Sequence, residues 1–216
     1  MEIKWHGQSC FQIRSGSVTV IIDPYGPEIG LTLPKLSADI VTISHQHPDH
    51  NNAAAIEGNP KIIMTGGITK YKNIEITGIE SFHDEEQGSK RGLNLIFTFS
   101  IDGIKIVHAG DLGQTSLTVD QLALLKDIDI LMIPVGGADF TIDAEGAIKI
   151  INQLNHPKII IPMHYGIKNI VFPLAPVDEF VEKSGIMPSR QDVLEITKES
   201  LPQETAIIIL SRHQTD

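Results

Sequence analysis

The sequence predicts an α/β protein in which buried strands outnumber helices. Short runs rich in Val and Ile, bounded by Gly, Pro, Asp or Asn, recur along the chain and are typical of buried strands. These runs cover residues 18–22, 39–43, 61–64, 104–107, 128–133, 159–161 and 206–210. Strands dominate the first half, and strands alternating with helices follow. Because aromatic residues make up only 5% of the chain, the predicted core is aliphatic.

Two further segments, 9–14 and 93–101, alternate between apolar and polar residues. This alternation is typical of antiparallel strands with one exposed face. The pair Asp102–Gly103 directly follows the second segment and predicts a tight hairpin turn.

Three helices are expected in the second half of the chain. A capping box begins at Thr118, apolar residues at helical spacing run from 143 to 154, and a third helix covers 177–183 and ends at Gly185. No repeat, low-complexity tract or linker divides the chain, so a single domain over 1–216 is expected.

The composition excludes several classes of protein. With 17 basic and 27 acidic residues, the formal charge is −10, and without a Lys/Arg block we expect no nucleic-acid partner. No segment approaches the roughly 18–20 apolar residues of a membrane span, and residues 1–4 do not resemble a signal peptide. The single cysteine, Cys10, cannot close an internal disulfide. We therefore expect a cytoplasmic protein acting on a small molecule, and a homo-oligomer is compatible with the sequence.

One dense group of polar residues indicates metal binding. The run His45-Gln46-His47-Pro48-Asp49-His50 directly follows the buried strand at 39–43 and precedes a short helix expected at 51–56. Three imidazoles and a carboxylate supply ligands suited to zinc, iron or manganese. The first two His can face one ion while Asp49 and His50 face another. A solvated His-rich loop is the alternative interpretation.

The spacing His45-x-His47-x-Asp49-His50 resembles the signature of the metallo-β-lactamase superfamily. Members of that family share an αβ/βα sandwich of two mixed sheets flanked by helices, with two metals at the strand ends. Later segments resemble further motifs of the family in order, namely Ile22-Asp23-Pro24, Phe82-His83, His108-Ala109-Gly110-Asp111 and Pro162-Met163-His164-Tyr165-Gly166. The opening segment at 5–11 is similar to the small metal-dependent hydrolase branch related to ascorbate-6-phosphate lactonase and N-acyl phosphatidylethanolamine phospholipase D.

The resemblance implies two metal sites that share one carboxylate. The first would use His45, His47 and His83, the second Asp49, His50 and His164, and Asp111 would belong to both. The residues support three of these positions independently, because predicted strands at 74–77, 104–107 and 159–161 precede His83, Asp111 and His164, and strand ends can converge on one edge. The alternatives are a solvated loop for His83, a turn or helix cap for Asp111 and a core histidine for His164.

Other polar residues are also expected near this site, each with a structural alternative. Asp23 is expected to hold a ligand His by its other ring nitrogen, or else to cap a strand end. His108 either lines the pocket or packs inside, and His6 either reaches the rim or is structural. The loop at 136–141 either presents backbone N–H groups to the pocket or only leads into a helix cap.

Two metals that share a carboxylate imply a bridging hydroxide as the nucleophile. The predicted reaction is hydrolysis of an ester, lactone, phosphodiester or amide in a small molecule. Asp49 and Asp111 are the predicted catalytic residues, with Asp49 passing a proton to the leaving group. Zinc or manganese is expected, and iron and nickel are also compatible with these ligands.

Two other functions use the same residues. An iron-dependent redox enzyme similar to sulfur dioxygenases would share the fold, and a metal-binding sensor would need no catalysis. Phosphorylated substrates would require Arg or Lys at the rim, where Lys90, Arg91 and Lys168 lie in loops near the motifs. Ordinary solvated surface residues are the alternative for all three.

Overall fold

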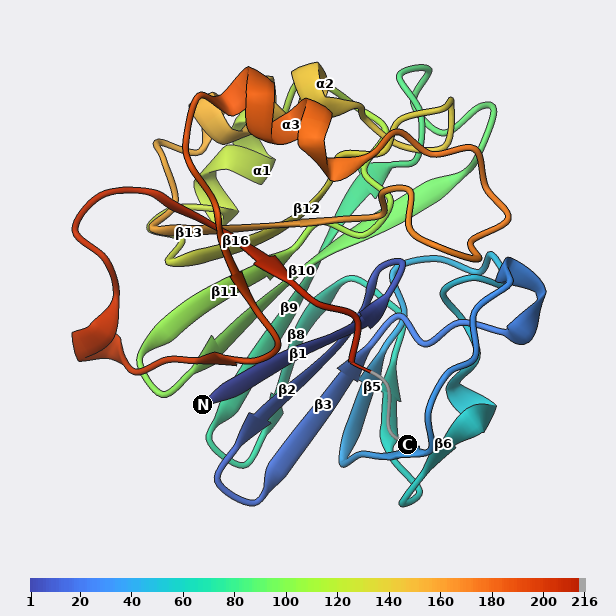
Figure 1. Ribbon diagram of the computed structural model, residues 1–216. Coiled ribbons are helices and arrows are strands. Elements are labelled where there is room, and N and C mark those ends of the chain that lie inside the picture. Colours follow the sequence, from blue (N-terminus) through green and yellow to red (C-terminus); the bar gives the residue numbers. More distant parts are fainter. Residues whose placement is uncertain (214–216) are drawn as a thin grey trace.

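The computed structural model describes residues 1–213 and consists of two mixed β-sheets packed face to face (Figure 1). The first sheet contains six strands in the order β15-β1-β2-β3-β5-β7. Their bounds are β1 (Glu2–Gly7), β2 (Cys10–Ser15), β3 (Val18–Ile22), β5 (Ile40–Thr42), β7 (Lys61–Ile63) and β15 (Leu194–Glu195). The strands from β15 to β3 are antiparallel, and β3, β5 and β7 are parallel.

The second sheet contains eight strands in the order β14-β16-β13-β12-β11-β10-β9-β8. Their bounds are β8 (Gly67–Tyr71), β9 (Ile74–Phe82), β10 (Leu93–Ile101), β11 (Ile104–His108), β12 (Ile130–Pro134), β13 (Ile159–Met163), β14 (Ser189–Gln191) and β16 (Ala206–Leu210). The neighbours from β14 to β11 are parallel, whereas β11, β10, β9 and β8 are antiparallel. A short parallel pair, β4 (Leu36–Ser37) with β6 (Ile56–Glu57), lies apart.

The helices α1 (Val119–Leu124), α2 (Ala144–Gln153) and α3 (Val177–Ser184) lie together at the top of Figure 1, over the second sheet. The predicted helices are confirmed with their caps: Thr118 forms the capping box with Gln121, and Gly185 ends α3 at a φ of 66°. The outer face of the first sheet is covered instead by loops with short 3₁₀ turns, whose apolar residues pack on Cys10, Ile21 and Val41.

The prediction of a helix at 51–56 is wrong. Only a 3₁₀ turn, Ala53–Ala55, forms there, because Ile56 is drawn into β6 and pairs with Leu36. The prediction that one face of 93–101 is exposed is also wrong, since β10 is an interior strand of the second sheet and is buried along most of its length. Its polar residue Asn94 is fully buried and hydrogen-bonded. The hairpin prediction is correct: Asp102 and Gly103 have φ angles of 52° and 75° and join β10 to β11.

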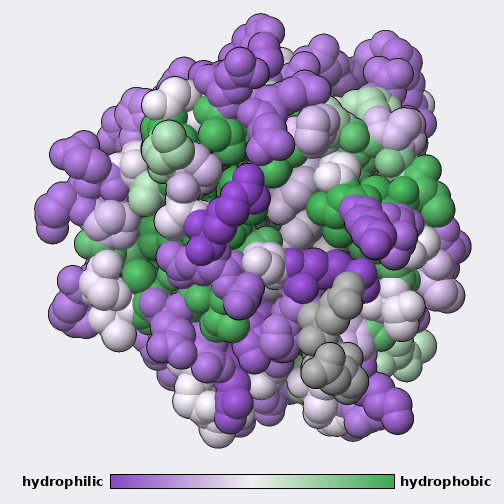
Figure 2. All heavy atoms as spheres, in the orientation of Figure 1, coloured by the Kyte–Doolittle hydropathy of each residue, from purple (hydrophilic) through white to green (hydrophobic). Residues whose placement is uncertain are grey.

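The core between the sheets and beneath the helices is mainly aliphatic, as the composition predicts, with a few aromatic side chains such as Trp5 and Phe97. Figure 2 shows one face of the molecule as mainly hydrophilic, with hydrophobic areas that are small and separate. None of the helices in residues 1–213 is long and apolar enough to cross a membrane.

Candidate metal centre

The carboxyl ends of strands from both sheets bring the seven predicted ligands together. β5 leads into the loop at 45–50, while β9, β11 and β13 end beside His83, Asp111 and His164. The seven side chains form two clusters, each with ligand atoms within 4.8 Å of one another: His45, His47 and His83 in the first, and Asp49, His50, Asp111 and His164 in the second. Each cluster therefore takes residues from both sheets.

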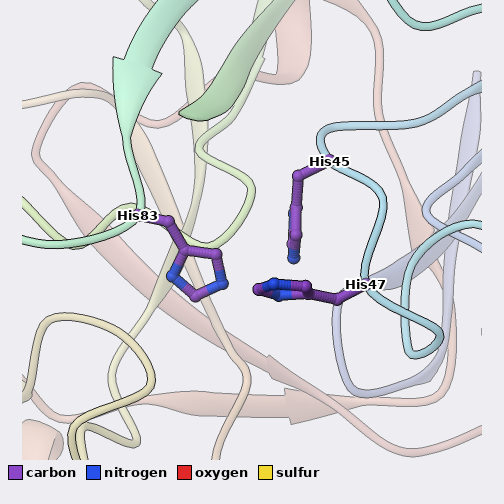
Figure 3. A group of neighbouring side chains, drawn as sticks. All are labelled: His45, His47 and His83. Atoms are coloured by element: carbon purple, nitrogen blue, oxygen red, sulfur yellow. The ribbon is translucent and has the colours of Figure 1, made fainter. Parts of the chain in front are cut away.

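The first cluster consists of three imidazoles that face a common point (Figure 3). The ring centre of His45 lies 4.6 Å from those of both His47 and His83, and His47 and His83 are 4.9 Å apart. His45 and His83 are buried, whereas His47 is partly exposed. The open side of this cluster is therefore next to His47.

A single oxygen of Asp111 lies between the two clusters. Its Oδ2 is 3.1 Å from Nε2 of His50, 3.2 Å from Nε2 of His164, 3.4 Å from that of His83 and 3.8 Å from that of His45. Asp111 is 2% exposed. One buried carboxylate thus faces four imidazoles drawn from both clusters.

The charges of the site favour a bound cation. Burial lowers the pKa of His45 to about 3, so its ring stays neutral and keeps a lone pair for a metal. Burial also disfavours a charged ring at His50, but the carboxylates of Asp111 and Asp49 outweigh it and raise its pKa well above the ordinary value. Such a shift marks a region of strongly negative potential. Burial opposes ionisation of Asp111, yet His164 and His50 hold its pKa well below the usual range.

Several buried ring nitrogens in residues 1–213 have no hydrogen-bond partner in the protein. They are Nε2 of His45 and His50, both nitrogens of His83, and Nδ1 of His164. A nitrogen that binds a metal ion lacks a protein partner in the same way. Leaving buried polar atoms unpaired is costly, so such a concentration favours a bound ligand here. Imidazole nitrogen and carboxylate oxygen are the donors that zinc, manganese and iron accept, so these residues fit divalent metal ions.

Asp23 supports both clusters from behind. Its Oδ2 accepts hydrogen bonds from Nδ1 of His50 at 2.9 Å and from Oγ of Ser44 at 2.6 Å. Ser44 Oγ also lies 3.0 Å from Nδ1 of His45. These contacts hold both rings by their Nδ1 atoms and leave both Nε2 atoms free. Asp23 therefore contacts both His50 and Ser44, and its Oδ1 also accepts from the Ser44 N–H, as a strand-end cap would.

Gln8 and Ser9 are site residues that sequence reasoning missed. They form the tight turn between β1 and β2, with Gln8 at a φ of 53°. Gln8 Nε2 donates to Oδ2 of Asp49 at 3.0 Å, and Ser9 Oγ donates to Oδ1 of Asp111 at 3.4 Å. Both residues are fully buried. The signal available was only two polar residues at a turn between two strands of alternating apolar and polar residues.

His108 and His6 lie in structural positions. His108 Nε2 contacts the Ser9 carbonyl oxygen at 2.8 Å, and its Nδ1 accepts from the Gly110 N–H. Both of its nitrogens are therefore used by the backbone. His6 is buried too, and its ring contacts Gln12 and the His213 carbonyl oxygen.

A polar cavity of about 950 Å³ lies beside the first cluster and meets it at His83. The loop at 136–141 forms part of its wall, as one interpretation of the sequence expected, and Asp143 also caps α2 through the Gly146 N–H. Within that loop Gly137, Ala138 and Asp139 have consecutive φ angles of 57°, 55° and 61°. For residues with a Cβ this conformation costs roughly 1–2 kcal/mol each. Strain of this kind is often retained where a loop serves a site.

Comparison with known proteins agrees with this geometry. The family model described as Beta-lactamase superfamily domain matches residues 2–164. A protein of Methanoculleus marisnigri is 31% identical, over 76% of this chain and 81% of its own, and one of Archaeoglobus fulgidus is 29% identical, over 82% and 87%. Both are named UPF0173 metal-dependent hydrolase.

A crystal structure from Thermotoga maritima superposes with a TM-score of 0.79 and 35% identity, covering 97% of both chains. It is described as a candidate zinc-dependent hydrolase of the metallo-β-lactamase superfamily. The predicted family and fold are confirmed, and the names of the relatives agree with the predicted metal-dependent hydrolase. The ordered motifs, the two-sheet sandwich and the family match lead to one conclusion: this chain belongs to the metallo-β-lactamase superfamily.

Proposed function

We propose that this protein is a binuclear metal-dependent hydrolase that cleaves an ester, lactone, phosphodiester or amide bond in a small molecule, acting as one catalytic domain. The observation that carries the proposal is the position of Asp111 Oδ2 among imidazoles of both ligand clusters. A carboxylate shared in this way can hold two cations close together by offsetting their mutual repulsion.

The chain's own residues have distinct tasks in this proposal. His45, His47 and His83 would hold one ion, and Asp49, His50 and His164 the other, with Asp111 between them. When bound, such ions lower the pKa of water towards neutrality and polarise the bond to be cleaved. Asp49 is suited to moving a proton, because Gln8 fixes its Oδ2 and its side chain remains 13% exposed.

Metal content gives the first test. We expect elemental analysis of protein reconstituted with zinc or manganese to return two ions per chain, because the two clusters have separate ligand sets. A saturated protein with one ion per chain would contradict the binuclear centre. Turnover of a panel of esters, lactones, phosphodiesters and amides with each metal tests hydrolysis itself. Iron that changes oxidation state during turnover would favour the redox alternative.

Gln8→Asn tests the support of Asp49. Asparagine tolerates the φ of 53° at this position but is one methylene shorter, so it no longer reaches Oδ2 and the carboxylate loses the bond that orients it. We expect metal affinity of the second cluster, measured by chelator competition, to fall by roughly 10- to 100-fold, as is typical when a ligand's outer partner is lost. Gln12→Asn is the control, because Gln12 lies on the adjoining strand and contacts His6 instead. Equal metal affinity in the two variants would show that Gln8 has no such role.

A further inference from the structure

The cavity beside His83 is lined by more acidic than basic side chains, and its two lysines are paired with carboxylates. Lys90 pairs with Glu86, and Lys149 pairs with Glu145 at 2.9 Å. Glu85 accepts a hydrogen bond from the Thr115 hydroxyl and Asp143 accepts one from the Gly146 N–H, and both carboxylates keep their charge. Both lysines of the lining are therefore already engaged.

Arg91 is a cation of this cavity that has no such partner. Within residues 1–213 its guanidinium makes no ion pair or side-chain hydrogen bond. The guanidinium carbon Cζ lies over the ring of Phe140, 4.7 Å from its centre, and that ring packs in turn on Phe172 at 5.1 Å. Stacking on an aromatic ring occupies the face of a guanidinium and leaves its N–H groups, which lie in the plane, free to bind a ligand.

The backbone at Arg91 is tied to a metal-ligand segment. Asp84, the residue after His83, is only 8% exposed. Its Oδ2 accepts the N–H groups of Lys90 at 3.0 Å and Arg91 at 2.8 Å, and its Oδ1 accepts two more N–H groups of the same loop. The loop is thus wound around one carboxylate, which fixes the backbone of Arg91 relative to His83. The Phe140 ring holds the side chain, and a guanidinium held in this way loses little conformational freedom when it binds a ligand.

We infer that Arg91 binds an anionic group of the substrate, a carboxylate or a phosphate, inside this cavity. The inference rests on the proposed function and names its substrate class: small molecules with one anionic group besides the bond that is cleaved. Paired N–H donors in a rigid plane match the two oxygens of such a group. Asp139, an exposed carboxylate of the opposite loop, would disfavour substrates that carry more negative charge near that rim.

The test compares the metal-reconstituted full-length protein with Arg91→Met and Lys149→Met. Methionine keeps a long side chain to pack on Phe140 but has no charge, and the Arg91 N–H to Asp84 is retained. Lys149→Met is the matched control, because Lys149 lines the same cavity but is already paired with Glu145. Calorimetric titration with inorganic phosphate and with glutarate measures anion binding without turnover, and the tighter anion identifies the class.

We expect Arg91→Met to weaken binding of the preferred anion by roughly 10- to 100-fold, the value of a charge-assisted hydrogen-bonded pair. The control should stay within about twofold of wild type by the same scale. In kinetics, Arg91→Met should raise KM for mono-p-nitrophenyl glutarate and leave KM for the neutral p-nitrophenyl valerate unchanged. Arg91→Lys should recover part of the affinity, since it restores the charge without the paired donors.

Anion binding that is absent from wild type, or equally strong in wild type and Arg91→Met, would overturn the inference. Failure of the proposed function looks different. If wild type cleaves no substrate of any panel, hydrolysis is contradicted while calorimetry still decides the role of Arg91. If both esters are cleaved with the same KM in all variants, the proposed hydrolase function is supported and the anion-binding role of Arg91 is contradicted.

Discussion

Asp111→Asn is expected to remove most of the activity and the ability to hold two ions at once. Asparagine keeps the shape of the side chain but removes the negative charge that faces four imidazoles. Without that charge, two cations held by the clusters would repel each other with little compensation. We expect elemental analysis to return fewer than two ions per chain, and turnover to fall by more than the roughly 10- to 100-fold that follows loss of an outer partner.

Folding should survive this change, because the apolar core is untouched. Asp127→Asn is a suitable control: Asp127 is an exposed turn residue with a φ of 55°, a conformation that asparagine tolerates well. The two variants should have the same far-ultraviolet circular dichroism. Two ions per chain and wild-type turnover in Asp111→Asn would show that this carboxylate only shapes a turn, and the binuclear proposal would fail.

Loss of one imidazole from each cluster should have a comparable effect on turnover but a distinct effect on metal content. His45→Ala removes a ligand of the first cluster and His164→Asn removes one of the second. Asparagine is the better choice at 164, because His164 has a φ of 51°, which strains alanine. Each variant should keep one ion per chain under conditions that give wild type two, and each should lose activity by orders of magnitude.

His156→Asn is the matched control for the second variant. His156 has a φ of 57°, almost that of His164, but it is exposed and lies in the turn after α2. Any effect of placing asparagine in this backbone conformation should appear in both variants, whereas loss of an ion should appear only at 164. If His45→Ala and His164→Asn both turn over substrate at the wild-type rate, the ligand assignment is wrong.

The resemblance to the family implied the predicted ligand set, and strand prediction supported part of it, because His83, Asp111 and His164 each follow a predicted strand and strand ends meet at a sheet edge. Gln8 and Ser9 could not be assigned in this way, since their partners Asp49 and Asp111 lie 41 and 102 residues away in the chain. Neither residue type is a preferred metal ligand. Their role exists only once the first hairpin packs against the loops of both sheets.

The local pattern also failed where a distant partner decided the outcome. The segment 51–56 contains three alanines, which favour a helix, yet pairing between Ile56 and Leu36 extends the chain. Arg91 was equally hard to assess, because its free guanidinium depends on which carboxylates are taken by Lys90 and Lys149. Such charge pairing between loops is a property of the fold, and a list of charged residues does not show it.

Because each ligand cluster takes residues from both sheets, metal binding affects the unfolding of the molecule. An ion bound by His45 and His83, or by Asp49 and His164, would act as a cross-link between chain halves in a protein whose single cysteine forms no disulfide. Ligands so distant in sequence come together only in the folded chain, so binding energy is added to folding energy. Removal of the ions would then lower the free energy of unfolding as well as the activity.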